Sequence, residues 1–228
     1  MSGMTGELGT LYIVATPIGN LEDITFRAVR ILKEVDLILA EDTRVSGKLL
    51  KHYDIKKPLL SYHQHSSEKK RLDILSHLVN GKNLALISDA GTPGISDPGN
   101  ELIDYLLTRE PNIKIVPIPG ASAVVTSLSI SGFRANKFIF LGFLPKKKRK
   151  RLFEWLVLSK MTFAFYESPK RLVKTLNELS EAFGKRRVLV ARELTKLHET
   201  LYRGEFVEVL AGLGDKNIKG EVVVVVEG

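Results

Sequence analysis

The feature that most constrains the fold is a recurring order of short apolar run, Gly- or Pro-containing turn and amphipathic stretch. Residues 10–15 form a β-rich run that ends at the turn 16–20, and a helical pattern follows through 27–32. The same order recurs along the first half of the chain. Alternation of this kind predicts a mainly parallel sheet that is covered by helices.

In the first half we expect strands at 10–15, 37–40, 84–88 and 114–117, and helices through 27–32, at 45–52 and 67–80, through 102–107, and at 121–131. In the helix at 67–80, Leu72, Leu75 and Val79 are expected on the buried face, and Gly81 marks its end. Ligands of such sheets bind beyond the carboxyl ends of the strands.

The pattern restarts after 131–136, with expected strands at 138–141, 162–166 and 188–191 and helices through 152–156 and at 170–183. Trp155 is expected in the core. Residues 200–203, 206–213 and 222–226 are expected to complete a mixed sheet, and the last of these runs is apolar enough to be buried on both faces. We therefore predict two domains, 10–120 and 121–228, with a boundary within 118–136 and a flexible leader at 1–9.

Composition excludes several classes of protein. The 228 residues contain no cysteine, which rules out disulfides, thiolate metal ligands and a Cys nucleophile. The start lacks the pattern of a signal peptide, and no apolar run approaches the ~18 residues of a membrane span, so we expect a cytoplasmic protein. The net charge of +8 and the pI near 9.5 favour a polyanionic partner such as RNA.

Three turns that follow predicted strands are rich in Gly, Pro and small residues: 16–20, 89–99 and 117–123. Each alone is typical of an α/β protein, but together they favour a preformed site where a ligand approaches the backbone closely. The second is an eleven-residue loop, where about 2 to 6 residues are usual. None is a phosphate-binding Walker loop or a G-x-G-x-x-G dinucleotide motif. A nucleoside-like cofactor other than ATP or NAD is predicted.

Seven motifs carry a resemblance to a known family: ATPIGNLEDITFRA (15–28), AEDTR (40–44), SYHQH (61–65), ISDAGTPGISDPG (87–99), PIPGASA (117–123), FYESPKR (165–171) and ARELTKLHE (191–199). Over residues 10–228 the chain resembles the tetrapyrrole methylase superfamily, and within it the branch that methylates the 2'-oxygen of a cytidine in 16S ribosomal RNA of the small subunit. The first loop, TPIGN, replaces the Gly-rich loop of the tetrapyrrole enzymes, and this difference points to the RNA branch.

The resemblance implies a homodimer of subunits with two α/β/α domains and with S-adenosylmethionine in the cleft between the domains. The cofactor-binding positions that it implies are Pro17, Asp89, Gly91, Thr92, Pro93, Ile95, Ala121, Ser122, Tyr166, Arg192 and Gly220.

Polar side chains gather after two further strands. Glu41, Asp42 and Arg44 follow the strand at 37–40, where they could act on substrate or form an ion-paired cap. His63 and His65 would share one face of an extended segment and suit RNA contact. Without Cys or further His the pattern does not indicate a zinc site, and no metal is predicted.

A second polar group lies at 193–199 after the strand at 188–191, and its alternative role is a solvated, salt-bridged loop. The run KKKRKR at 146–151 is either a solvated stretch entering a helix or a phosphate contact. The predicted RNA-binding residues are Arg44, His65, Lys146, Lys147, Lys148, Arg149, Lys150, Arg151 and Arg171.

The implied reaction is displacement of the sulfonium methyl by a ribose 2'-oxygen, in which positioning should dominate the rate. A base, or a cation that favours the alkoxide, would help, and the candidates are Lys196, Glu193, Asp42 and His63. Two alternatives stay open: a methyltransferase that acts on a small tetrapyrrole-like substrate, and a non-catalytic RNA-binding protein. For an RNA methyltransferase, the predicted partner is 16S ribosomal RNA or the small subunit, and no membrane association is expected.

Overall fold

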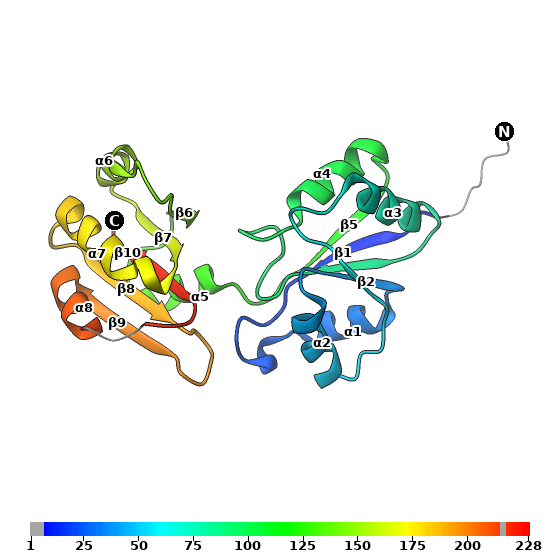
Figure 1. The fold of residues 1–228 in the computed structure, drawn as a ribbon, viewed down its shortest axis with the longest axis horizontal. Helices are drawn as coiled ribbons and strands as arrows, with labels where there is room; N and C mark the ends of the chain where they lie inside the picture. Colours follow the sequence, from blue (N-terminus) through cyan, green and yellow to red (C-terminus); the bar gives the residue numbers. More distant parts are fainter. Residues whose placement is uncertain (1–6, 215–217) are drawn as a thin grey trace. The chain divides into compact units, whose positions relative to one another are not determined.

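The computed structural model describes residues 7–214 and 218–228, and the chain divides into two compact units, Met1–Ser122 and Ala123–Gly228 (Figure 1). Residues 1–6 of the predicted leader lie outside the described residues. Gly9 is buried, and its N–H donates to the carbonyl of Leu78 at 2.8 Å, while Leu8 packs against the core. Leu8 and Gly9 therefore belong to the folded unit, ahead of the first strand.

The first unit is built on a five-stranded, fully parallel sheet in the order β3-β2-β4-β1-β5. The strands are β1 (Thr10–Val14), β2 (Leu37–Ala40), β3 (Leu59–Ser61), β4 (Leu84–Ile87) and β5 (Lys114–Ile118). All four residues of β4 are buried, as expected for a central parallel strand. Pro117 is tolerated because β5 lies at the edge of the sheet, where one side of the strand needs no ladder hydrogen bonds.

Helices cover both faces of this sheet, as Figure 1 shows. The helices are α1 (Phe26–Glu34), α2 (Thr43–His52), α3 (Glu68–Val79) and α4 (Asn100–Arg109), with a 3-10 turn, η1, at Leu21–Asp23. The apolar faces of α1 and α2 pack on one side of the sheet, and those of α3 and α4 pack on the other. The predicted layered α/β architecture is confirmed.

The predicted buried face of α3 is wrong at two of its three residues, since only Leu75 packs against the core. Ile74 and Leu78 are fully buried, whereas Leu72 and Val79 are 50% and 46% exposed. Residues four apart lie one above the other on a helix, so both sets form a plausible apolar stripe. Only the position of the sheet decides which stripe is covered.

The second unit contains a mixed five-stranded sheet in the order β6-β7-β10-β8-β9. The strands are β6 (Phe138–Phe143), β7 (Thr162–Glu167), β8 (Arg187–Arg192), β9 (Thr200–Glu205) and β10 (Val222–Val226). Only the β6–β7 pair is parallel. The central strand β10 consists of five buried valines, which confirms the prediction of a strand covered on both faces.

On one side of this sheet lies α5 (Ala123–Ser131), and on the other lie α6 (Lys150–Ser159), α7 (Pro169–Phe183) and α8 (Phe206–Leu213). The prediction that 206–213 joins the sheet is wrong. A capping box starts α8, in which the Glu205 side chain accepts from the backbone of Glu208 and the Glu208 side chain accepts from that of Glu205. Trp155 is 53% exposed, because the sheet covers the face of α6 that carries Phe153 and Leu156.

Within the described residues, no helix is both long and apolar enough to cross a membrane.

Candidate active site

The three Gly- and Pro-containing loops of the first unit meet at one edge of its sheet. They follow β1, β4 and β5, which are neighbours in the sheet, so their carboxyl ends lie side by side. Thr16 and Gly91 form an antiparallel bridge with N–H···O distances of 2.8 and 3.1 Å. The Thr92 hydroxyl donates to the carbonyl of Ala121 at 3.2 Å. These bonds join the loops into one preformed cradle, which we define as residues 15–20, 88–95 and 118–122.

Two glycines allow the loops of the cradle to approach so closely. A Cβ on Gly120 would lie 2.9 Å from the Cβ of Ala15, closer than real Cβ atoms come. Gly91 has φ +84°, a conformation that L side chains rarely adopt, and a Cβ there would contact Ile18 at 3.4 Å. Side chains other than hydrogen are therefore disfavoured at both positions.

A buried hydroxyl stabilises the base of the cradle. Thr16 is 2% exposed, and its hydroxyl donates to the carbonyl of Ser88 at 3.1 Å. Because a buried polar group must be hydrogen-bonded, this contact fixes the first loop against the end of β4.

The acidic pair after β2 lies next to the cradle. The backbone N–H of Asp42 donates to the Asp89 carboxylate at 3.0 Å. The Asp42 side chain caps α2 and binds the Arg44 guanidinium, with Nη2···Oδ2 at 2.6 Å. This contact with Arg44 holds the pKa of Asp42 well below its ordinary value. Asp42 is thus an ionised helix cap and a weak proton acceptor.

Glu41 differs from its neighbour. Its carboxyl is partly buried, and burial together with the nearby charge of Asp89 raises the pKa of Glu41 above its ordinary value. A carboxyl with a raised pKa is a better general base near neutral pH than one with a lowered pKa. The sequence placed Glu41 at a strand end but did not rank it among the proton acceptors, because burial is a tertiary property.

The two histidines after β3 lie in a turn, and the expected extended segment is wrong. The Ser66 N–H donates to the His63 carbonyl at 2.8 Å, and the His65 N–H donates to Nδ1 of His63 at 3.2 Å. The rings still lie near each other, with centroids 6.5 Å apart. In the part of the chain that the structure describes, no group of three or more His, Asp or Glu is arranged to hold a metal ion.

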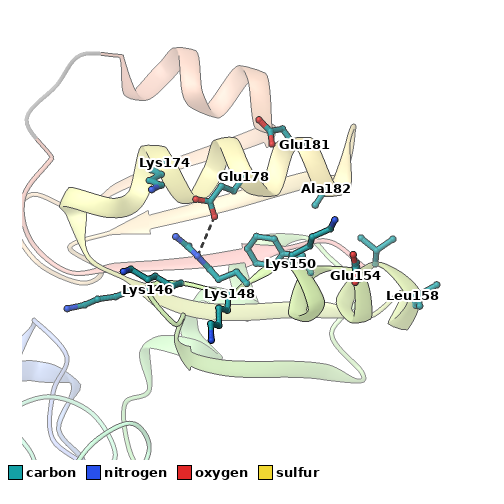
Figure 2. A pocket seen from close by; sticks show the side chains of 13 residues that line it. Lys146, Lys148, Lys150, Glu154, Leu158, Lys174, Glu178, Glu181 and Ala182 are labelled. Atoms are coloured by element: carbon teal, nitrogen blue, oxygen red, sulfur yellow. Dashed lines mark ion pairs between the residues drawn. The ribbon is translucent and has the colours of Figure 1, made fainter.

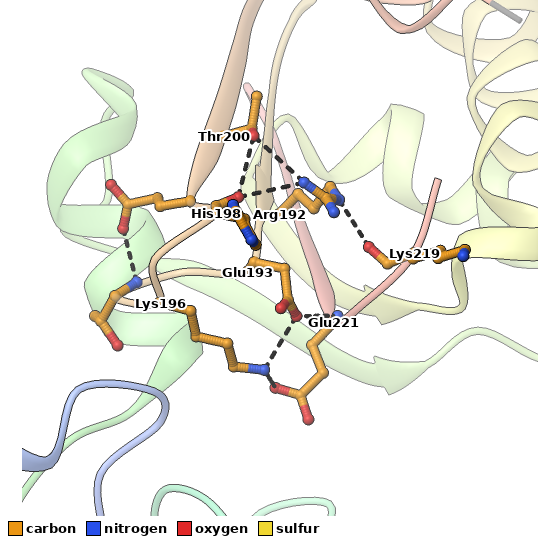
Figure 3. A network of polar contacts seen from close by, with 9 residues as sticks. Arg192, Glu193, Lys196, His198, Thr200, Lys219 and Glu221 are labelled. Carbon is orange, nitrogen blue, oxygen red and sulfur yellow. Dashed lines mark hydrogen bonds and ion pairs between the residues drawn. The ribbon is translucent and has the colours of Figure 1, made fainter. Parts of the chain in front are cut away.

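The second unit has a polar network of its own after β8 (Figure 3). Nζ of Lys196 lies 3.0 Å from Oε1 of Glu193 and 2.9 Å from Oε2 of Glu221. Oε1 of Glu193 also accepts from the backbone N–H of Glu221 at 2.8 Å. Burial lowers the pKa of Lys196, but hydrogen bonds to the two carboxylates outweigh it and leave that pKa raised. Lys196 is therefore held as an ammonium and is suited to act as a cation, not as a base.

Glu193 is held in its ionised form by the same contacts. Burial raises the pKa of Glu193, but the Glu221 N–H and Lys196 outweigh that effect and leave it below its ordinary value. Like Asp42, it is a weak proton acceptor.

Comparison with known proteins identifies the family. The model of the tetrapyrrole (corrin/porphyrin) methylases matches residues 10–210. The chain belongs to the tetrapyrrole methylase family. Curated relatives named ribosomal RNA small subunit methyltransferase I share 49% identity with it. The one from Halalkalibacterium halodurans aligns over 97% of this chain and 77% of its own length, and the one from Thermotoga maritima over 97% and 99%.

Solved structures of the tetrapyrrole methylase family share the fold. The cobalamin biosynthetic enzyme cobalt precorrin-4 methyltransferase superimposes with a TM-score of 0.72 at 18% identity, over 96% of this chain and 94% of that one. Uroporphyrin-III C-methyltransferase from Thermus thermophilus, in complex with S-adenosylhomocysteine, gives a TM-score of 0.64 at 16% identity, over 95% and 92%. Membership of the family makes this chain a methyltransferase.

Within this methylase, the predicted cofactor residues of the first unit all belong to the cradle. Pro17, Gly91 and Pro93 are buried in it and shape its wall, and Thr92, Ala121 and Ser122 are partly exposed. Asp89 and Ile95 are exposed, Ile95 by 48%. The exposed and partly exposed members are the ones that a ligand can touch without rearrangement of the loops.

The predicted cofactor residues of the second unit each have contacts inside that unit. Arg192 donates from Nε to the carbonyl of Lys219 at 2.7 Å, and Tyr166 packs edge-on against Phe140 with centroids 5.2 Å apart. Gly220 has φ +90°, and a Cβ there would overlap the Glu193 carboxyl group. A side chain at 220 would therefore displace the Glu193 carboxyl group and strain the backbone.

The basic run of this methylase contains two kinds of side chain. Lysines 146–148 and 150 and Arg151 are exposed, but Arg149 is only 7% exposed. Its Nη1 donates to the Thr175 hydroxyl at 2.9 Å. Arg171 binds the buried Glu167 carboxylate at 2.5 Å. Arg149 and Arg171 therefore hold the unit together, whereas the lysines, Arg151, Arg44 and His65 are exposed and can reach a phosphate.

Proposed function

We propose that this methylase transfers a methyl group from S-adenosylmethionine to the ribose 2'-oxygen of a cytidine in 16S ribosomal RNA. The observation that carries the proposal is the 49% identity, over 97% of this chain, to relatives named ribosomal RNA small subunit methyltransferase I. The cytidine and the 2'-oxygen follow from the motif resemblance, chiefly from TPIGN in place of a Gly-rich first loop.

The cradle fits the cofactor chemically. S-adenosylmethionine supplies a methyl group already activated by a positively charged sulfur. The exposed carboxylate of Asp89 suits the positive charges of such a ligand. Thr92 and Ala121 present hydroxyl and carbonyl groups from two loops that are already joined. The prediction that the cofactor lies between the domains stays a prediction.

Orientation of the 2'-hydroxyl supplies most of the rate enhancement, since the leaving group needs no protonation. Of the four residues predicted to assist, Lys196 serves as a cation that favours the alkoxide, and Glu193 holds it in place. Asp42 positions Arg44, and His63 serves RNA binding together with His65. Glu41 is added as the carboxyl best suited to accept the hydroxyl proton.

The proposed partners are 16S ribosomal RNA or the small subunit in the cytoplasm, with no membrane and no metal, and a second copy of the chain. The homodimer is what the family resemblance implies, and exposed apolar side chains are available for such a contact: Phe26 is 98% exposed and Leu197 is 94% exposed. Light scattering after size exclusion measures the mass directly, and a monomer at working concentration would overturn this part.

The test of function is methyl transfer from labelled S-adenosylmethionine to small subunits that lack the modification, with the product nucleoside identified by mass spectrometry. We expect 2'-O-methylcytidine. A Gly91→Val variant, whose side chain would strain the backbone at φ +84° and crowd Ile18 and Ala121 in the cradle, should lose cofactor binding and label together, whereas Gly47→Ala, at a position with open space around it, should retain both. Cofactor binding without label in RNA would indicate a small tetrapyrrole-like substrate, and RNA binding without cofactor affinity a non-catalytic RNA-binding protein.

A further inference from the structure

A groove of about 920 Å³ runs between α6 and α7 in the second unit (Figure 2). Its apolar lining includes Phe153, Val157 and Ala182, of which Phe153 is buried beneath it. This volume lies at the upper end of the roughly 300–1,000 Å³ typical of small-molecule sites. The groove is thus large enough for more than one planar ring, and its apolar surface suits the face of a base.

Positive charge dominates the lining. Five lysines line the groove: Lys146, Lys147, Lys148, Lys150 and Lys174. Glu178 lies opposite them, but Oε2 of Glu178 is 3.3 Å from Nε of Arg149 and so its charge is compensated. The two other acidic residues are Glu154 and Glu181. Figure 2 shows Lys146 and Lys174 at one end and Glu154 with Leu158 at the other, so the groove is polarised along its length.

The buried Arg149 fixes the lysines at the basic end. It lies in the middle of the run, and its guanidinium reaches the Thr175 hydroxyl on α7 at 2.9 Å. That hydroxyl in turn donates to the Glu167 carboxylate at 2.7 Å. Lysines 146–148 are therefore held beside α7 as part of the folded unit. Lysines on an anchored backbone lose less entropy on binding phosphates than lysines on a mobile tail do.

We propose that this groove binds a single-stranded segment of the RNA substrate, with phosphates on the lysines and with bases over the apolar lining. A single strand is favoured because its unstacked bases can enter a groove that a duplex cannot. Glu154 and Glu181 suit the exocyclic amino groups of bases, since carboxylates accept hydrogen bonds from them. The inference rests on the proposed function and assigns to it a substrate site remote in sequence from the cradle.

The charge part is tested with two matched triple variants. Lys147→Gln/Lys148→Gln/Lys174→Gln removes charge from the groove, and Lys137→Gln/Lys160→Gln/Lys185→Gln removes the same charge from exposed positions that do not line it. Binding of a fluorescent single-stranded RNA of mixed sequence is followed by anisotropy. We expect the groove variant to bind the RNA about tenfold more weakly. The slope of log affinity against log salt concentration should also be smaller by about two, because each lost phosphate contact lowers it by ~0.7. Equal losses in the two triples would overturn the proposal.

The shape part is tested without any change of charge. Ala182→Trp fills the groove from an exposed position on α7, and Val173→Trp places the same side chain nine residues away, on the opposite side of the helix. We expect only Ala182→Trp to weaken single-stranded RNA binding, about tenfold, with S-adenosylmethionine affinity as in the wild type. RNA affinity equal in the two variants, or duplex RNA affected as strongly as single strands, would overturn the proposal.

These outcomes are separable from those of the proposed function. If the function fails, the wild-type protein itself places no methyl group in ribosomal RNA. If only the groove fails, the wild-type protein methylates the RNA and the groove variants match their controls.

Discussion

At the residue scale, two consecutive carboxyl groups have opposite properties. Asp42 binds Arg44 and its pKa falls, whereas Glu41 is partly buried beside Asp89 and its pKa rises. The folded state thus carries Glu41 as a carboxylate only at a cost in stability. Groups retained at such a cost are frequent at functional sites.

We predict that Glu41→Gln stabilises the protein at neutral pH. A raised pKa means that the folded state binds the proton more tightly, so stability falls as pH rises from 4.5 through the folded pKa, and glutamine removes this loss. The gain is below about 1 kcal/mol because solvent screens a partly exposed group. Thermal unfolding should show this gain in stability at neutral pH, and should show no gain well below pH 4.5. Glu22→Gln, on an exposed side chain, is the control, and a gain at both pH values would contradict the prediction.

Gly220 offers a second prediction at this scale. Gly220→Ala combines the cost of φ +90° with displacement of Glu193, the partner of Lys196. Gly132→Ala, at φ +74° with open space, carries only the conformational cost. We expect urea unfolding to show a loss of about 1–3 kcal/mol for Gly220→Ala and a smaller one for Gly132→Ala. Methyl transfer should fall in Gly220→Ala and stay unchanged in Gly132→Ala. Equal losses of stability and of methyl transfer in the two variants would show that the contact with Glu193 is unimportant.

At the element scale, the basic run 146–151 contains both the exposed lysines of the proposed groove and the buried Arg149 that anchors them. The guanidinium of Arg149 lies 3.9 Å from the Glu167 carboxylate, whose side chain is fully buried. Charges in such a place are tolerated only when paired, because desolvation is costly. The sequence shows six consecutive cations and no sign that one of them points inward.

We predict that Arg149→Met lowers the free energy of unfolding by about 3 kcal/mol, since it leaves the buried Glu167 carboxylate without one of its partners. Lys148→Met, on the exposed neighbour, should change it by less than about 0.5 kcal/mol. Urea titration of both variants checks this difference. Similar values for the two would mean that Arg149 contributes no more than a solvated lysine.

The elements themselves were largely predictable, and the exceptions share a cause. Strands such as β2 and β10 are short apolar runs with clear boundaries, which local pattern reveals. Residues 206–213 are apolar on most sides and therefore fit a strand or a helix equally. The predictions for Trp155 and for the buried face of α3 were wrong for the same reason. Each helix carries more apolar residues than one face of a sheet can cover.

At the scale of the whole molecule, the net charge of +8 makes RNA binding sensitive to salt. With at least three phosphate contacts, affinity for single-stranded RNA should fall about tenfold or more between roughly 50 and 200 mM salt. Affinity for S-adenosylmethionine, a small ligand, should change little. Anisotropy measures the affinity for RNA and calorimetry the affinity for S-adenosylmethionine across the salt series. An RNA affinity that does not change with salt would contradict the importance of the lysines.

The sequence by itself determined the alternation of strands and helices, the position of the three loops after β1, β4 and β5, and the family, because these depend on local pattern and on motifs read directly from residues. The tertiary structure decided which apolar stripe is covered, which cation of the basic run is buried, and which carboxyl has a raised pKa. Burial and pairing depend on segments distant along the chain, such as Glu41 beside Asp89 and Arg149 beside Thr175. Local pattern carries no information about those neighbours.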